Sequence, residues 1–521
     1  MSLVAQLPAV IGALPGVLHG ALLGAAEPAF RGPTIDYHAL APEIILTATV
    51  VVLVLLDSIK LERAKAFMPV VTNLGLLAAL IPLLTLAYDG GTRVLFGGSY
   101  VVGPMSLLLK AMFLVSAYVV VLLSTNYVAE GDYWESEYYT LLVCSVLGMV
   151  VMASTRDLIG IFVALELLSI PAYMLASWRK GDVRSNEAGM KYYLMGVFAS
   201  AVLLYGMSLV YGLGGSTQLE EIGRAIADAP DKGVPVITLA LLFVVVGFAF
   251  KVSAVPFHVW APDTYEGAPT PVTAFLAVAS KAAGFVALIS LVFYAFLPRA
   301  DIIQPLFFVL AVASMTVGNL AALRQTNVVR MLAYSGIAQA GFMLAPFVVA
   351  GENPFAAMQA VVIYLVIYAA MNLGAFAVII AIARKTRSAE LKDLAGIVHS
   401  MPGMAWCMVL FLASLIGIPP LGGWYAKFGV FKVLVGAETG LGWATAIIMA
   451  INTAIAAYYY LNVAKAMIFD DAPDGDTAPA PRTPPSLSAA VGIALVATFA
   501  FGVLPGLLTN VTAYGPLALG G

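Results

Sequence analysis

Charged side chains are scarce in this sequence. Of its 521 residues, 11% are Asp, Glu, Lys or Arg and 61% are hydrophobic, whereas a typical soluble domain is about a quarter charged and about half apolar. A soluble fold has too little interior to bury so much apolar surface. The composition therefore excludes an ordinary soluble enzyme and predicts an integral membrane protein.

Cysteine is also nearly absent, which limits the cofactors that the chain could hold. Only Cys144 and Cys407 occur, each within an apolar run and far apart in the sequence, so neither a disulfide framework nor an iron–sulfur ligand set is available. The four histidines are not placed as facing pairs on two helices, and no dinucleotide or Walker loop is present. We expect no haem, flavin, nucleotide or metal in this chain, and the net charge of −3 without a basic stripe argues against nucleic acid.

Apolar runs of about 20 residues recur along the chain, and alternation with a period of two is absent, so the spans are predicted to be helices and not the strands of a barrel. Residues 1–40 are predicted to form an N-terminal extension, with an additional helix as the alternative. The runs predict an all-α protein of about fourteen transmembrane helices, at residues 43–57, 67–87, 104–125, 138–153, 158–178, 190–212, 234–255, 271–297, 302–323, 328–350, 355–383, 403–436, 441–468 and 486–508.

The distribution of Lys and Arg between the predicted helices indicates their orientation. Connections after odd-numbered helices hold thirteen of these residues, and connections after even-numbered helices hold five. Because cytoplasmic loops are enriched in Lys and Arg, we expect the odd connections in the cytoplasm and both termini on the outer side. The polar linker that opens the last part of the chain would then also be cytoplasmic.

Three lysines lie in apolar surroundings far from any predicted loop. Lys251 follows the run LALLFVVVGFAF, Lys281 lies within TAFLAVASKAAGFVALISLV, and Lys427 follows the interrupted segment SLIGIPPLGGWYAKF. An isolated ammonium in the membrane costs at least about 2.5 kcal/mol, so such residues are functional candidates. The alternative is a lysine that only bonds a carbonyl or pairs with a carboxylate. Lysines near the helix ends are expected to extend to the interface: Lys110, Lys432 and Lys465.

Glu166 is the one carboxylate that is clearly central to a predicted span, and it needs a cationic partner. Lys251 or Lys191 could supply this charge, and separation of such a pair would change the proton affinity of both groups. Glu43 and Asp57 are expected to face the interfaces. His258 follows Lys251 by seven residues, with Pro256 between them; it suits either a proton relay or a helix-end histidine bonded to a backbone carbonyl.

Two segments combine an apolar helix, an interruption and a lysine: FKVSAVPFHVWAPD and SLIGIPPLGGWYAKF. They lie five predicted helices apart, an odd spacing that inverts the second unit relative to the first. Interrupted helices in corresponding positions of two halves indicate inverted repeats with an ion site near the midplane. Carbonyls freed at such breaks must face protein or a water-filled cavity.

The string FKVSAVPFHVWAPDTYEGAPTPVTAFLAVASKAAGF, together with GIPPLGGWYAKF, NEAGMKYYLMG and PEIILTATVVVLVLLD, resembles the subunit N family of the proton-pumping NADH-quinone oxidoreductase, respiratory complex I. The resemblance covers nearly all of the chain after about residue 40. It implies an antiporter-like fold with broken helices 7 and 12 and two inverted five-helix repeats, helices 4–8 and 9–13. The site residues that it implies are Glu166, Lys251, Lys281, Lys427, Lys191 and His258.

These observations predict a domain order of an N-terminal extension (1–40), helices 1–3 (41–125), a first repeat (126–297), a second repeat (298–468), and a linker with helix 14 (469–521). The resemblance implies proton translocation in a bacterial cytoplasmic membrane, beside other membrane subunits of the complex. NADH, flavin, iron–sulfur clusters and quinone would be used by other subunits. Two alternatives stay open: a subunit of a multi-chain sodium/proton antiporter, and a membrane scaffold that does not pump.

Overall fold

The computed structural model describes residues 35–58, 67–130, 135–229, 234–473 and 481–513. The chain divides into two compact units, residues 1–36 and 37–521, and the second contains every helix and strand named here. The predicted N-terminal extension lies almost wholly outside the described residues. Both ends of the chain do so as well.

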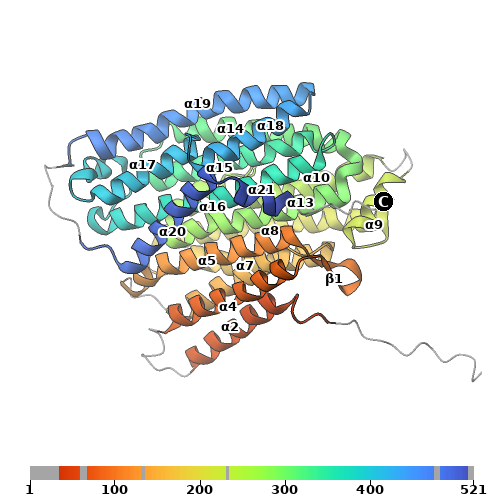
Figure 1. Ribbon diagram of the computed structural model, residues 1–521, viewed down its shortest axis with the longest axis horizontal. Coiled ribbons are helices and arrows are strands. Elements are labelled where there is room, and N and C mark those ends of the chain that lie inside the picture. The colour runs from red at the N-terminus through yellow and green to blue at the C-terminus, as the bar shows by residue number, and fades with distance from the viewer. Residues whose placement is uncertain (1–34, 59–66, 131–134, 230–233, 474–480, 514–521) are drawn as a thin grey trace, which may run out of the picture. The chain divides into compact units, whose positions relative to one another are not determined.

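Long helices that lie side by side make up most of the second unit (Figure 1). The first group comprises α2 (Ala41–Ser58), α4 (Met68–Asp89), α5 (Pro104–Glu130), α6 (Glu135–Met152), α7 (Leu158–Ala176), α8 (Val183–Gly214), α9 (Leu219–Ala227), α10 (Val234–Lys251), α11 (Trp260–Gly267), α12 (Thr270–Phe275) and α13 (Lys281–Leu291). The second group comprises α14 (Ala300–Ala322), α15 (Val328–Leu344), α16 (Pro354–Thr386), α17 (Pro402–Ile416), α18 (Gly422–Gly436), α19 (Gly440–Phe469), α20 (Pro485–Val503) and α21 (Gly506–Ala513).

Short elements join these helices. An antiparallel hairpin connects α4 to α5, and it consists of β1 (Arg93–Leu95), η2 (Phe96–Gly98) and β2 (Tyr100–Val102). The remaining short turns of helix are η4 (Leu276–Ser280), η5 (Val292–Phe296), η6 (Leu297–Arg299), η7 (Ala345–Val349), η8 (Leu391–Leu394) and η9 (Ile397–His399).

Each of the fourteen predicted spans coincides with one helix or with a run of successive helices. By length and composition alone, ten helices in the described part of the chain could cross a membrane, or eleven if a bent pair around residue 400 forms one span. Four of the predicted spans are not counted separately. The apolar parts of α6 and α10 are shorter than 18 residues, the helices from Thr270 to Ala322 continue without a loop, and the break after Ile416 leaves α17 and α18 with 15 residues each. The chain is therefore a mostly helical, multi-span membrane protein.

The interior of the bundle consists of helices that are apolar on every face. Helices α15 and α16 are almost wholly buried, and so is the continuous segment from α12 through α13. A helix of this kind is stable only when other helices surround it. In Figure 1, α2 and α4 lie at one edge of the second unit and α19 at the opposite edge. These edge helices expose large apolar side chains, as lipid or neighbouring membrane chains require.

Polar residues fix where several of the helices begin. Asp157 accepts hydrogen bonds from the backbone N–H groups of Ile159 and Gly160 at the start of α7, and Asn327 does the same for Val329 and Arg330 at the start of α15. Such caps satisfy donors that the helix itself leaves unpaired. They therefore fix the register of the two helices on which the central site depends.

Candidate functional site

Lys251, Lys281 and Lys427 all lie inside the bundle, with exposed fractions of 3%, 2% and 7%. None of the three has a carboxylate within ion-pair distance in the described residues. Their partners are hydroxyl groups and backbone carbonyls instead. An ammonium held by neutral groups in an apolar interior has little to balance its charge.

Lys251 ends α10, immediately before the predicted break. Its Nζ donates to Ser169 Oγ on α7 at 2.8 Å and to Tyr192 OH on α8 at 3.2 Å. The break itself is internally bonded, since Trp260 Nε1 at the start of α11 donates to the carbonyl of Phe250 at 3.0 Å. The interruption thus brings the end of one helix against two others without leaving that carbonyl unpaired.

Glu166 lies on α7, three residues before Ser169, and is half-buried. It accepts a hydrogen bond from Ser200 Oγ at 2.6 Å. The expected ion pair of Glu166 with Lys251 or Lys191 is absent from this conformation, and that prediction is wrong as a description of it. The physical reason is that hydroxyl groups on α7 and α8 satisfy Glu166 and Lys251 separately. Glu166 and Ser169 still share one helix face, because they lie three residues apart.

Lys281 lies in the fully buried segment, between η4 and the rest of α13. Its Nζ donates to the backbone carbonyl of Gly336 on α15 at 2.8 Å. Glycine permits this approach, because a Cβ at residue 336 would lie 3.0 Å from Lys281 Nζ and 3.2 Å from Tyr368 OH. The small residue on α15 and the lysine on α13 therefore form one site.

Replacing Gly336 by Ala is expected to displace the Lys281 ammonium by a few tenths of an ångström. The resemblance to subunit N implies that Lys281 takes part in proton translocation, and proton transfer depends steeply on the distance between the groups. On that expectation, coupled turnover should fall about two- to tenfold while the chain still assembles. Proton uptake by membrane vesicles would measure this. Gly492→Ala, where the added methyl group meets nothing within 4 Å, is the control. Equal rates in the two variants would contradict the assigned role of Gly336.

Lys427 lies on α18, beyond the second break. Its Nζ donates to the carbonyl of Ile416 at 3.0 Å and lies 4.7 Å from the centre of the Phe342 ring. Ile416 is the last residue of α17, and Gly417 follows it with a φ of 99° that favours glycine. The carbonyl that the break frees from the helix is therefore the one that holds the lysine.

Uncharged polar groups on α15 and its neighbours lie next to both the Lys281 site and the Lys427 site. Gln339, one turn after Gly336 on α15, accepts a hydrogen bond from Tyr364 OH at 2.6 Å. Its amide nitrogen donates to the carbonyl of Leu415 at 3.2 Å, next to the Ile416 carbonyl that binds Lys427, and to Tyr460 OH at 3.3 Å. Sequence analysis missed these groups. The available signal was the polar pair of Ser335 and Gln339 within the apolar stretch of α15.

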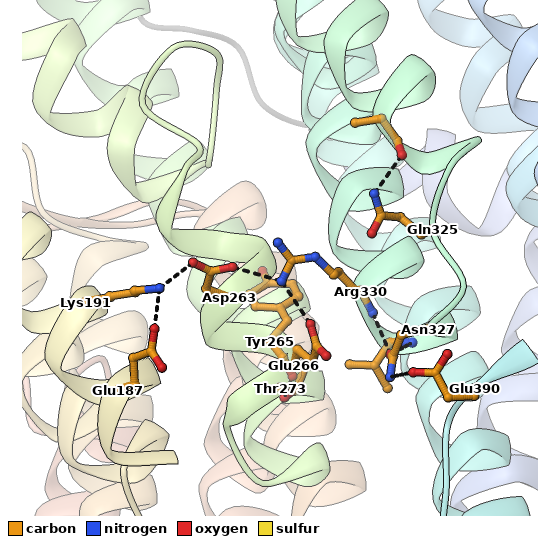
Figure 2. A network of polar contacts seen from close by, with 12 residues as sticks. Glu187, Lys191, Asp263, Tyr265, Glu266, Thr273, Gln325, Asn327, Arg330 and Glu390 are labelled. Carbon is orange, nitrogen blue, oxygen red and sulfur yellow. Dashed lines mark hydrogen bonds and ion pairs between the residues drawn. The ribbon is translucent and has the colours of Figure 1, made fainter. Parts of the chain in front are cut away.

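Lys191 does not join the buried lysines. Figure 2 shows it in a partly exposed network, where its Nζ lies 2.6 Å from Glu187 and 2.7 Å from Asp263. Arg330 on α15 contacts the same Asp263 at 2.8 Å and Glu266 at 2.9 Å. The network therefore ties α8 and α11 to α15 by charge, and Lys191 is already neutralised by two carboxylates.

His258 lies in the break between α10 and α11 and is half-buried. Lys251 and His258 do not lie two turns apart on one continuous helix, because α10 ends at Lys251. The Nδ1 atom of His258 is buried and has no hydrogen-bond partner among the described residues. It is therefore an unpaired, titratable nitrogen beside the first break.

Lys110 and Glu43 correct a further expectation. Both were predicted to face the interfaces, but Lys110 is 0% exposed and its Nζ lies 2.6 Å from Glu43 Oε1. The hairpin between α4 and α5 covers the pair, and so prevents Lys110 from reaching the surface. Tyr100 of this hairpin donates to the same Glu43 oxygen at 2.5 Å. Lys432, Lys465 and Asp57 are exposed, and their location at the membrane interface stays a prediction.

Comparison with known proteins places this arrangement in a family. Residues 154–453 match the family described as "NADH:quinone oxidoreductase/Mrp antiporter, TM". The NADH-quinone oxidoreductase subunit N of Moorella thermoacetica is 40% identical over 475 residues, which cover 91% of this chain and 97% of that protein. A second such subunit, subunit N 1 of Koribacter versatilis, is 38% identical and covers 93% of this chain and 96% of its own length.

Solved structures give the same result. A chain of respiratory complex I from Thermus thermophilus, with bound aureothin, is 35% identical with a TM-score of 0.76, covering 91% of this chain and 100% of its own. A chain of the Mrp complex from Dietzia sp. is 20% identical with a TM-score of 0.79, covering 92% of this chain and 96% of its own, which shows a shared fold. The chain belongs to the NADH-quinone oxidoreductase subunit N family, within the NADH:quinone oxidoreductase and Mrp antiporter membrane proteins.

Proposed function

We propose that this chain is a proton-translocating membrane subunit of an NADH-quinone oxidoreductase, in which electron transfer in other subunits drives protons through a relay of buried charges. The observation that carries the proposal is the set of three buried lysines, each bonded only to neutral groups in the described residues. A lysine in such a site changes its proton affinity strongly when a carboxylate approaches or leaves. The subunit itself would carry no redox centre.

The relay would begin at Glu166 and Lys251. Glu166 shares a face of α7 with Ser169, the group that holds Lys251, so a change of side-chain conformation could exchange the hydroxyl partner for the carboxylate. The next member of the relay would be Lys281. It lies on α13, the helix on which Gly284 allows the side chain of Lys251 from α10 to pack closely. Gln339 and its tyrosine partners then lead to Lys427.

His258 and Lys191 would serve this relay from its margin. The unpaired Nδ1 of His258 beside the first break could accept and donate a proton. Lys191, fixed between Glu187 and Asp263, would set the local charge at the start of α8 and take no proton itself. The proposal thus gives His258 a proton-carrying role and Lys191 an electrostatic one.

We also propose the finer architecture of fourteen helices with inverted repeats over residues 126–297 and 298–468. Its support is a local likeness between α7 and α15. Each begins with a side-chain cap, at Asp157 or Asn327, and each cap residue pairs with a later segment through an isolated bridge. Nine residues after these caps lie Glu166 and Gly336, which belong to the Lys251 and Lys281 sites respectively.

In this proposal the chain lies in a bacterial cytoplasmic membrane with both termini outside and the odd connections in the cytoplasm, as the Lys and Arg distribution indicates. Its partners would be other membrane subunits of the complex, including a neighbouring antiporter-like subunit. The exposed apolar faces of α2 and α4 suit such contacts. NADH, flavin, iron–sulfur clusters and quinone would act in those other subunits.

The Lys251→Ala variant tests the proposal directly. Proton pumping and NADH-driven quinone reduction would be measured together in membrane vesicles, with assembly of the complex checked separately. We expect the assembled variant to lose pumping and to reduce quinone more slowly, because the first lysine of the relay is missing. Normal pumping and normal reduction would show that the buried lysines are structural and that the chain is a scaffold.

A further inference from the structure

A second buried charge site lies outside the three lysines, at the contact of α2, α5 and the hairpin between α4 and α5. We propose that Glu43, Lys110 and Tyr100 form a further proton-exchange site of this subunit. The inference rests on the proposed function, because it assigns a second site to the same transport activity.

The three side chains form a closed triangle. Lys110 Nζ lies 2.6 Å from Glu43 Oε1 and 3.3 Å from Tyr100 OH, and Tyr100 OH donates to Glu43 Oε1 at 2.5 Å. Lys110 Nζ also lies 5.1 Å from the centre of the Tyr100 ring. Lys110 therefore donates to both other members of the triangle, and Tyr100 donates to Glu43.

The pair differs from a static ion pair in how the carboxylate is held. Both donors, Lys110 and Tyr100, bind the Oε1 atom of Glu43, while the Oε2 atom is buried and accepts no hydrogen bond from any described residue. A buried ion pair is stabilising only when its remaining lone pairs are satisfied. An unpaired carboxylate oxygen in an apolar setting is instead a position at which a proton can bind.

The exchange conserves charge and atoms. A proton binds Glu43 at Oε2 and neutralises the carboxylate, and Lys110 then releases one of its own ammonium protons. The pair is now a neutral acid beside a neutral amine. Transfer of the carboxylic proton across the Glu43–Lys110 contact restores the starting ion pair. One proton has entered and one has left, and the pair is ready for the next cycle.

The backbone connects this site to the start of the helix that carries Glu166. Val101 N in β2 donates to the carbonyl of Ser154 at 2.8 Å, and Arg156 N donates to the carbonyl of Ser99 at 2.8 Å. The next residue, Asp157, caps α7. A shift of Tyr100 as Glu43 changes its protonation state would therefore reach the N-terminus of α7.

The decisive variant is Lys110→Arg in the full chain, assembled in the complex and reconstituted into vesicles. Arginine keeps the positive charge opposite Glu43 but cannot release its proton, so it separates exchange from simple ion pairing. We expect turnover coupled to pumping to fall about tenfold or more. The second variant, Glu43→Gln with Lys110→Met, removes both charges with little change in volume, and the same loss is expected.

Lys465 and Asp470 provide matched controls, because they form an exposed pair at 3.4 Å. Lys465→Arg and the double variant Lys465→Met with Asp470→Asn should pump as the unaltered chain does. If Lys110→Arg or the neutral double variant assembles and pumps normally, the Glu43–Lys110 pair is a structural contact and the inference is wrong.

Tyr100→Phe tests the exchange site if the other variants fail to assemble, because it removes only one hydroxyl group. Slower pumping in this variant supports exchange, and an unchanged rate opposes it. The proposed function is tested separately by the unaltered chain and Lys251→Ala in the same vesicles. Absence of pumping by the unaltered complex would overturn the proposed function, whereas normal pumping by Lys110→Arg would overturn the inference alone.

Discussion

Replacement of Lys281 by Met is expected to abolish proton pumping by the assembled complex. Methionine has nearly the length of lysine and suits the apolar surroundings of α13, so packing should be kept while the ammonium group of this site is removed. The bond to the Gly336 carbonyl is lost with it. Loss of a proton-transfer group typically slows a reaction about a hundredfold or more. Pumping and quinone reduction in vesicles would measure the effect.

Lys465→Met is the matched control, because it makes the same substitution at an exposed position near the end of α19. It should leave pumping unchanged. If Lys281→Met assembles and pumps as well as Lys465→Met does, Lys281 is a buried structural lysine. The scaffold alternative would then replace the relay for this part of the chain.

Replacement of Gly423 by Ala is expected to prevent correct packing of the second broken helix. A Cβ at this position would lie 1.7 Å from the Ser414 carbonyl oxygen, which belongs to the backbone of α17. No side-chain rotation can relieve that overlap, so α18 must move away from α17. Overpacking of this kind costs about 3 kcal/mol or more. Lys427 lies one turn further along α18 and would move with it, so both the thermal midpoint and pumping should fall.

The control for this variant is Gly429→Ala on the same helix, where an added methyl group meets nothing within 4 Å. Alanine is favoured over glycine in a helix interior by about 0.5–1 kcal/mol, so this variant should be as stable as the unaltered chain or slightly more so. Thermal unfolding of the purified complex would compare the two. Equal midpoints would show that the two backbones do not approach as closely as described.

Most of the helices and their breaks could be predicted from the sequence, because an apolar chain can span lipid only as helices or as a closed barrel. Each predicted span coincides with a helix or a run of helices, and the proline- and glycine-containing segments near Lys251 and Lys427 do interrupt helices. The burial of Lys251, Lys281 and Lys427 was also predictable from the apolar runs around them. The roles of these residues stay predictions until the variants are measured.

The partners of those residues could not be predicted. Sequence position suggested a Glu166–Lys251 pair, but hydroxyl groups of Ser200, Ser169 and Tyr192 satisfy the two charges separately. Position near a helix end suggested that Lys110 faces the interface. The fold instead places the hairpin over it and brings Glu43 from α2 to its side.

The sequence by itself determined that the chain lies in a membrane as helices, where these helices break, and which lysines have no loop nearby. These properties depend on local hydrophobicity and on proline and glycine, which act within a few residues. Only the tertiary structure decided which acceptor each ammonium meets: the carbonyl of Gly336 for Lys281, that of Ile416 for Lys427, and the carboxylate of Glu43 for Lys110. Two of these partners lie more than fifty residues away along the chain. Their distance is set by how whole helices pack, which no local pattern encodes.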